Sequence, residues 1–212
     1  MARFSKGILG PFSGGVGTVI GGTWKGISYM RSKPLPTNRE PSIKQLEQRE
    51  KFKVMVRFLR TITGLVTVTF KDSAIQMSGF NAAFKYNINS VITGSYPDYE
   101  IVFENVLVSR GDLPNGINPA AAMGQGAQIL FSWTPNTGTG KAADTDKTVK
   151  VVYCPGRNQA IFEFGVGRNT GGDQIAVAAF AGETVHTWLG FISENAKSIA
   201  TSVYTGSFTI PG

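Results

Sequence analysis

The first 34 residues combine dense glycine with dense apolar side chains, and this combination limits the possible folds more than any other feature of the sequence. Eight of these residues are glycine, and aromatic or branched aliphatic residues stand between them, where a flexible linker would carry serine and charge. Glycine lets one backbone approach another closely or adopt a positive φ angle. Ordering a backbone costs about 1–2 kcal/mol per residue, so such a segment becomes ordered only when its apolar side chains are covered. We therefore expect residues 1–34 to form a docking arm that lies on its own body or on a neighbouring copy.

The arm offers both apolar anchors and basic side chains for docking. An extended segment of about 30 residues reaches up to about 100 Å at about 3.3 Å per residue, far beyond a single domain. Exchange of arms between copies gives head-to-tail contacts, which close into rings or continue as filaments. The expected assembly interface consists of five buried anchors (Phe12, Val16, Val19, Ile20 and Trp24) and three charge partners (Lys25, Arg31 and Lys33).

Positive charge is concentrated in the first part of the chain. The net charge is +7; through Arg60, twelve basic residues stand against three acidic ones, a net +9, which leaves −2 for the rest. A basic front and a mildly acidic rear suit contact between copies, and they suit contact with a phosphate backbone equally well. A nucleic-acid binder is therefore one alternative, although the aromatic residues lie among aliphatic ones and present no obvious stacking platform.

The pattern after the arm changes from helical to β. Helices are expected over residues 42–63, where Ser42 and Gln45 stand at capping-box spacing, and over residues 78–92, which Gly94 follows. Residues 65–71 alternate and are β-branched, which favours a short strand or an extended connection. Seven short runs with frequent alternation follow, at residues 100–108, 128–133, 148–153, 159–164, 174–180, 185–193 and 198–210, with turn residues between them.

This order predicts a mainly β fold with a small α part. We expect an antiparallel β-sandwich of the immunoglobulin type, preceded by the glycine-rich arm and two helices. The expected domains are a basic docking arm over residues 1–34, a two-helix segment over residues 35–95 and the sandwich over residues 96–212.

The second half of the chain resembles a fibronectin type III or immunoglobulin-like module. Residues 129–135 (ILFSWTP) are similar to that family's second strand, whose core tryptophan is here Trp133. Within residues 180–188, His186 stands where the family has its corner tyrosine. Residues 198–204 resemble the closing strand, with its repeated small hydroxyl residues.

The whole chain also resembles an uncharacterised domain family abundant in Bacteroidetes and in their phages. Four motifs carry this resemblance: FSGxVGxVIGxxWKGxxYxRSKP over residues 12–34, GFNAA over 79–83, YPDY over 96–99 and VSRG over 108–111. It brings no catalytic residues with it.

Residue types that carry catalysis or bind metals and cofactors are sparse. One histidine and one cysteine, His186 and Cys154, do not make a zinc site, and Asp144-x-Asp146 lacks the glycine and closing glutamate of a calcium loop. A lone histidine in a strand is more typical of a core or corner position than of a catalytic base. The glycine spacing at residues 15–21 misses the dinucleotide fingerprint, and Lys141 of a P-loop-like TGTGK is not followed by a hydroxyl residue. We expect no catalytic, cofactor-binding or metal-binding residue.

The sequence therefore predicts a non-enzymatic structural or assembly protein. We expect a phage-particle component (a ring, capsid accessory or tail protein) that binds other copies of itself and neighbouring assembly proteins. It would be made in the cytoplasm without a signal peptide, would contain no membrane span, and would end in the virion. One alternative is a surface-recognition module that binds carbohydrate or protein through loops such as residues 136–147. The other is a non-specific nucleic-acid binder that uses the basic N-terminal half.

Overall fold

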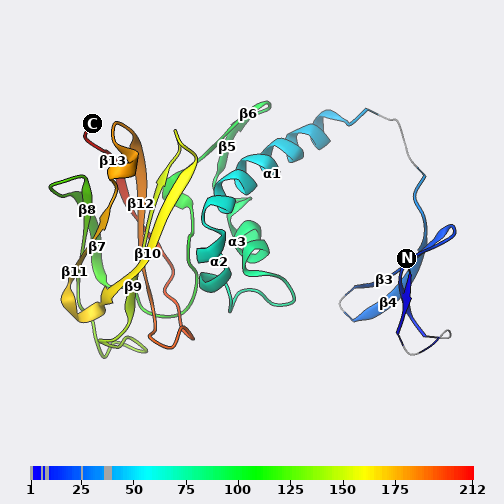
Figure 1. Cartoon of the computed structure of the whole chain (residues 1–212), viewed down its shortest axis with the longest axis horizontal. Coiled ribbons are helices and arrows are strands. Elements are labelled where there is room, and N and C mark those ends of the chain that lie inside the picture. The colour runs from blue at the N-terminus through cyan, green and yellow to red at the C-terminus, as the bar shows by residue number, and fades with distance from the viewer. Residues whose placement is uncertain (1, 6, 8–9, 25, 36–39) are drawn as a thin grey trace. The chain divides into compact units, whose positions relative to one another are not determined.

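The computed structural model describes residues 2–5, 7, 10–24, 26–35 and 40–212. The chain divides into two compact units, Met1–Ser42 and Ile43–Gly212, which we call the arm unit and the body (Figure 1).

The described part of the arm unit folds into one antiparallel sheet. Its strands follow each other in the order β1-β2-β3-β4. Gly17 and Gly26 adopt positive φ angles of 57° and 83° in the turns that follow β2 and β3, a region in which a Cβ atom is strained. Because the chain turns back on itself, the reach of about 100 Å expected for an extended arm is wrong. The strand bounds are β1 (Arg3–Phe4), β2 (Phe12–Val16), β3 (Val19–Trp24) and β4 (Ile27–Ser32).

Both helices expected from the sequence are present. The first is α1 (Ile43–Thr61), whose apolar stripe buries Met55, Phe58 and Leu59. The second is α3 (Gly79–Asn87), which ends at Asn87 rather than at residue 92. The Ser78 hydroxyl caps the N-terminus of α3, since it accepts a hydrogen bond from the Asn81 N–H at 3.2 Å.

The expectation of a strand or extended connection at residues 65–71 is wrong, because this segment forms a helix, α2 (Thr63–Thr69). Residues 40–212 therefore contain three α-helices rather than two. Burial of Leu65, Val66 and Thr69 follows helical spacing. Thr69 also donates its hydroxyl to the Val108 carbonyl at 2.8 Å, which ties the helix to a distant segment. Tertiary packing here overrides the β propensity of the local sequence.

The body contains two larger antiparallel sheets, and its mainly β, antiparallel character is confirmed. One sheet has four strands in the order β10-β9-β12-β13, and the other has three in the order β11-β8-β7. The bounds are β7 (Ile117–Met123), β8 (Gln128–Thr134), β9 (Lys147–Cys154), β10 (Gln159–Gly167), β11 (Gly172–Ala176), β12 (Thr184–Ile192) and β13 (Val203–Thr209), with 3₁₀ turns η2 (Arg168–Thr170) and η3 (Ala178–Phe180) between strands.

Four segments differ from the expected strands. The run expected at residues 174–180 ends as a strand at Ala176 and is followed by η3, and the run expected at residues 198–210 is a strand only over β13. The run expected at residues 100–108 is a strand only at its start, where β6 (Asp98–Ile101) pairs with β5 (Ile92–Ser95), and a 3₁₀ turn η1 (Phe103–Asn105) follows. Strand β7 has no counterpart among the expected runs, because its sequence INPAAAM has no apolar–polar alternation and only one β-branched residue, Ile117.

The body is built in three layers, with the helices against one face of the four-stranded sheet and the three-stranded sheet against the other (Figure 1). In β9, Val149, Val151 and Tyr153 pack with the helices, while Val152 and Cys154 pack with the three-stranded sheet. Burial on both faces explains why β9 reads as a nearly continuous apolar run. Division of the chain at residues 34/35 and 95/96 stays a prediction.

A buried ion pair ties the two sheets together. Lys150 of β9 places its Nζ 3.0 Å from Oδ1 of Asp173 in β11, and the two side chains are 3% and 8% exposed. The Thr148 hydroxyl donates to Asp173 Oδ2 at 2.6 Å. Burial alone raises the pKa of Asp173, but hydrogen bonds from Thr148, Lys150 and two backbone N–H groups lower it overall. The aspartate is thus held as an anion, which fixes the position of β11 over β9.

Candidate assembly interface

The strand register of the arm unit sorts its side chains onto two faces. Residues directly opposite each other in an antiparallel pair point to the same side of the sheet, and successive residues point to opposite sides. The pairs Phe4↔Phe12, Val16↔Val19 and Gly21↔Met30 therefore define one face, and the pairs Gly22↔Tyr29 and Trp24↔Ile27 define the other. We call the first the phenylalanine face (Phe4, Phe12, Val16, Val19 and Met30) and the second the tryptophan face (Ile20, Trp24, Ile27 and Tyr29).

Two adjacent glycines of β3 make room for aromatic rings on the two faces. A Cβ atom on Gly21 would lie 2.3 Å from the Phe12 carbonyl oxygen and 2.7 Å from its ring, so Phe12 lies against the bare backbone of Gly21. A Cβ atom on Gly22 would lie 3.1 Å from the Tyr29 hydroxyl. Neither glycine has a positive φ angle. Their function is therefore to accept rings across the strand, rather than to make the arm flexible.

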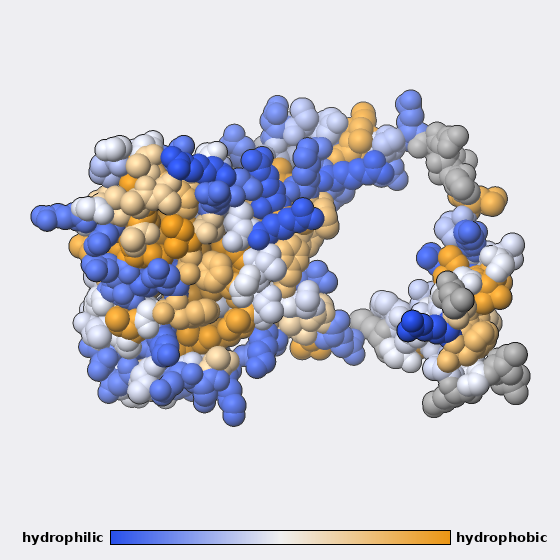
Figure 2. Space-filling view, viewed as in Figure 1, coloured by the Kyte–Doolittle hydropathy of each residue, from blue (hydrophilic) through white to orange (hydrophobic). Residues whose placement is uncertain are grey.

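The arm sheet has no core of its own. Among its described residues only Gly21 is buried. Trp24, Ile27 and Met30 are 62%, 65% and 71% exposed, and Figure 2 shows hydrophobic residues at the surface of this unit. A small sheet becomes stable when an apolar face packs against something, and contiguous exposed apolar surface marks an interaction site. Both faces of the arm sheet carry exposed apolar side chains, so we expect each face to pack against another surface.

The expected interface residues are split between the two faces. Phe12, Val16 and Val19 lie on the phenylalanine face, whereas Ile20, Trp24 and Arg31 belong to the opposite one. Lys33 follows β4, and its N–H donates to the Thr18 carbonyl at 2.7 Å. Lys25 lies outside the described residues. Four further exposed apolar residues of these faces were not among the expected interface residues: Phe4, Ile27, Tyr29 and Met30. The run ISYMRS over residues 27–32 does not alternate strictly, so their division between two faces depends on the strand pairing. The interface itself stays a prediction.

A basic cleft of about 570 Å³ runs along α1. Lys53, Arg57 and Arg60 line it together with the apolar Phe52 and Val56. Lys53 pairs with Glu50 at 3.2 Å, whereas Arg57 and Arg60 make no ion pair with any residue in the described part of the chain. Figure 2 shows hydrophilic residues in a dense row over this helix. An anionic partner would find these two guanidinium groups available.

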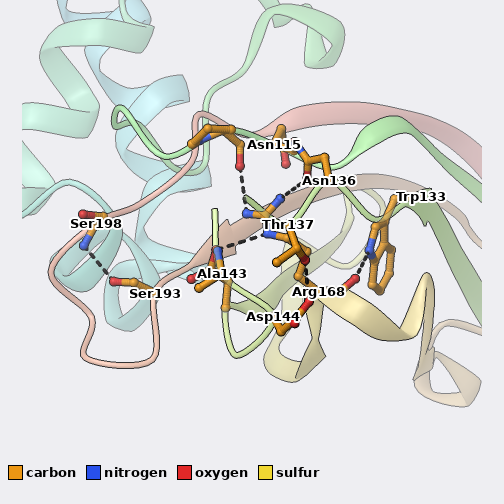
Figure 3. A network of polar contacts seen from close by, with 11 residues as sticks. Asn115, Trp133, Asn136, Thr137, Ala143, Asp144, Arg168, Ser193 and Ser198 are labelled. Atoms are coloured by element: carbon orange, nitrogen blue, oxygen red, sulfur yellow. Dashed lines mark hydrogen bonds and ion pairs between the residues drawn. The ribbon is translucent and has the colours of Figure 1, made fainter. Parts of the chain in front are cut away.

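A second polar arrangement is centred on the fully buried Arg168 (Figure 3). Its Nε donates to Asp146 Oδ2 at 3.1 Å, its Nη1 to Asn136 Oδ1 at 2.7 Å, and its Nη2 to the Pro114 carbonyl at 2.8 Å. Its guanidinium carbon also lies 4.1 Å from the centre of the Phe191 ring. Burial lowers the pKa of Arg168, and Asp146 opposes that shift. The network anchors both ends of the loop at residues 136–147, so this loop is a rigid part of the surface.

Asp144 and Asp146, which the sequence analysis compared with a calcium loop, both accept hydrogen bonds from neighbouring residues. Asp146 accepts from both Arg168 and the Ala143 N–H, and Asp144 accepts from the Thr137 hydroxyl. Within the described residues no group of three histidine, cysteine or acidic side chains is placed to hold a metal ion.

His186 lies on β12, where its side chain makes a hydrogen bond to the neighbouring strand. Its Nδ1 is 2.9 Å from the Tyr204 hydroxyl of β13, and its ring stacks on Phe103 with centroids 4.0 Å apart. Burial lowers the pKa of His186, with Glu104 acting in the opposite direction. This environment favours the neutral imidazole and anchors η1 against the sheet.

Comparison with known proteins assigns a family. A family model described as a family of unknown function, DUF6266, matches residues 11–206, and the chain therefore belongs to that family. No curated protein matches the sequence. None of the helices in the described residues is long and apolar enough to cross a membrane.

Proposed function

We propose that this member of the family is a non-enzymatic building block that assembles with further copies of itself, and with neighbouring assembly proteins, through its arm unit. One observation carries the proposal: the arm sheet presents apolar side chains on both faces and, among its described residues, buries only Gly21. A tether would instead be polar or rich in serine. The body needs no such cover, because its two hydrophobic cores lie within residues 43–212.

We also propose that the two packed sheets of the body are of the fibronectin type III kind. The seven strands β7–β13 are divided between the two sheets as they are in that family. The first, second and fifth strands (β7, β8 and β11) form the three-stranded sheet, and the other four form the four-stranded sheet. Trp133 supports this assignment, since it lies on the second of these strands and packs edge-on against Phe191 of the opposite sheet. Its indole N–H donates to the Arg168 carbonyl at 2.7 Å.

The setting that we propose for this assembly is a phage particle. Support comes from the resemblance carried by residues 12–34, 79–83, 96–99 and 108–111. Three of these four motifs have structural roles in the body or arm: the first spans β2–β4, the second opens α3, and the last contains Ser109, whose hydroxyl donates to the Ala200 carbonyl at 2.8 Å. A building block of a ring, capsid or tail would act through such scaffold features rather than through a catalytic site.

The test is the mass of the full chain in solution, measured by light scattering after size-exclusion chromatography over a range of concentrations. We expect an oligomer that loses subunits when residues 1–34 are removed, or when Trp24 and Ile27 are both changed to serine. Ile75→Ser is the matched control, because Ile75 is 78% exposed on the body and its loss should leave the mass unchanged. A monomer in every version at all concentrations would reject arm-mediated assembly.

Surface recognition is a second candidate, favoured by two shallow clefts of about 580 Å³ each that share Lys141, Lys197 and Ser198. One of them is lined by the loop at residues 136–147, which the Arg168 network holds rigid. A preformed polar cleft loses little entropy on binding a sugar or peptide. Binding of the full chain to a glycan array, and loss of that binding in Lys141→Ala and Lys197→Ala, would support this candidate; no signal above a control protein would reject it for carbohydrates.

A further inference from the structure

Strand β4 has an open backbone edge. It is the last strand of the arm sheet and, among the described residues, bonds only to β3. The Lys33 N–H points toward β3, since it donates to the Thr18 carbonyl. Backbone groups alternate in direction along a strand, so those of Arg31 and Tyr29 also point toward β3. Those of Ser28, Met30 and Ser32 therefore point outward.

This edge lacks most of the features that usually prevent strands from pairing. Edge strands in monomeric proteins are protected by charged side chains (lysine above all), by proline, by a bulge or by a very short length. Strand β4 is six residues long, contains neither lysine nor proline, and pairs with β3 without a register shift; its one charged residue is Arg31. All six of its residues are exposed. Unpaired N–H and C=O groups flanked by exposed apolar side chains form a template for another strand.

We propose that β4 pairs in antiparallel orientation with β4 of a second copy of this chain, with Met30 opposite Met30. This inference rests on the proposed function and names the contact through which the arm units meet. The outward-pointing backbone groups limit the possible registers. Ser28, Met30 and Ser32 of one copy must lie opposite residues from the same set in the second copy, because only these residues can exchange hydrogen bonds across the junction. Shifting the pairing by two residues in one direction would place Pro34, which has no N–H, opposite Ser28. Shifting it in the other would recruit Gly26, which lies in the turn at φ 83°.

The side chains fit this register. Tyr29 falls opposite Arg31 of the second copy, and Ser28 falls opposite Ser32. Each guanidinium therefore meets an aromatic ring rather than a like charge, an arrangement that favours cross-strand pairing. Across the β4–β4 junction, the phenylalanine face and the tryptophan face each continue from one copy into the other. Each apolar face of the joined sheet therefore has twice the area of that face in one copy. The arm unit carries six basic residues against one acidic residue, a net +5, so pairing should strengthen as salt screens the two copies from each other.

Cysteine cross-linking of the full chain tests the register. Met30→Cys places two thiols directly opposite each other, with Cα atoms about 5.5 Å apart in a hydrogen-bonded pair. Ser28→Cys is the matched control: it is exposed on the same edge, but its two copies would lie four residues out of line, about 13 Å apart. The native Cys154 is fully buried and gives little background. The thiols are joined with the short dithiol reagent dibromobimane, and covalent dimers are counted on a denaturing gel.

We expect Met30→Cys to give at least ten times more covalent dimer than Ser28→Cys alone or Ser32→Cys alone. Mixing the Ser28→Cys chain with the Ser32→Cys chain should restore the dimer, because those two positions face each other. Equal cross-linking at all three positions, or none at Met30→Cys, overturns the inference. Light scattering on the same samples distinguishes the β4 register from the proposed assembly. An oligomer that gives no Met30→Cys cross-link would reject only the β4 register, whereas a monomer would reject the proposed assembly as well.

Discussion

The Asp146→Ala substitution should destabilise the body strongly, because it orphans the buried charge of Arg168. The two side chains are 2% and 0% exposed, and Arg168 Nε lies 3.1 Å from Asp146 Oδ2. Removing one partner of such a pair costs about 3–5 kcal/mol, since the remaining charge is neither solvated nor paired. For a body of 170 residues, this loss corresponds to a fall in Tm of roughly 6–20 °C.

Urea denaturation followed by tryptophan fluorescence measures the loss as a change in the free energy of unfolding. Asp144→Ala is the control two residues away: Asp144 is exposed and its side chain accepts a hydrogen bond from the Thr137 hydroxyl, so its removal should cost about 1 kcal/mol or less. Adding Arg168→Met to Asp146→Ala removes the orphaned charge and should recover part of the stability. A loss at Asp146 no larger than that at Asp144, or no recovery in the double variant, would refute the reasoning.

Three further predictions concern the arm, the histidine and the charge of the chain. Gly21→Ala should abolish self-association without lowering the Tm of the body, because its Cβ would clash with the Phe12 carbonyl oxygen; Gly15→Ala, whose Cβ meets nothing within 4 Å, should leave the oligomer mass unchanged. The free energy of unfolding should fall as pH drops below about 6.5, because burial lowers the pKa of His186 in the folded state and the unfolded chain therefore takes up the proton first. In urea melts between about pH 7.5 and 5.5, His186→Gln should show a smaller change in the free energy of unfolding with pH. Sedimentation at 50 and 500 mM salt should show stronger self-association at the higher salt, whereas binding of a fluorescent DNA duplex, if the basic α1 cleft supported it, would weaken steeply.

Several elements could be predicted from the sequence because their signals are local. The α1 stripe repeats at helical spacing, so Met55 and Leu59 identify the buried face without knowledge of their partners, whereas the buried Phe58 lies outside the stripe read from the sequence. Strands β8 to β13 could be anticipated because turn residues separate alternating or β-branched runs. The docking role of the arm was expected from its glycine and aromatic residues, and it stays a prediction.

Other features depend on contacts between residues far apart in the sequence. Segment α2 has β-branched residues, and it is helical because this conformation buries Leu65 and Val66 on one face and lets Thr69 donate to the Val108 carbonyl. Strand β7 has an alanine-rich sequence and is a strand because β8 offers it hydrogen-bonding partners. Arg168 is an ordinary surface residue by its sequence neighbours; only the fold gathers Asp146, Asn136 and Pro114 around it.

The sequence by itself determined that the opening segment combines dense glycine with dense apolar side chains, a combination that is costly to order in water and that predicts a covering surface. Tertiary structure decided the form of that segment. Cross-strand pairing places Phe12 over Gly21 and Tyr29 beside Gly22, so the glycines serve as platforms in a folded sheet. It also decided that the apolar side chains divide between two faces and that β4 keeps an open edge, since strand register depends on hydrogen bonds between distant residues rather than on any local pattern.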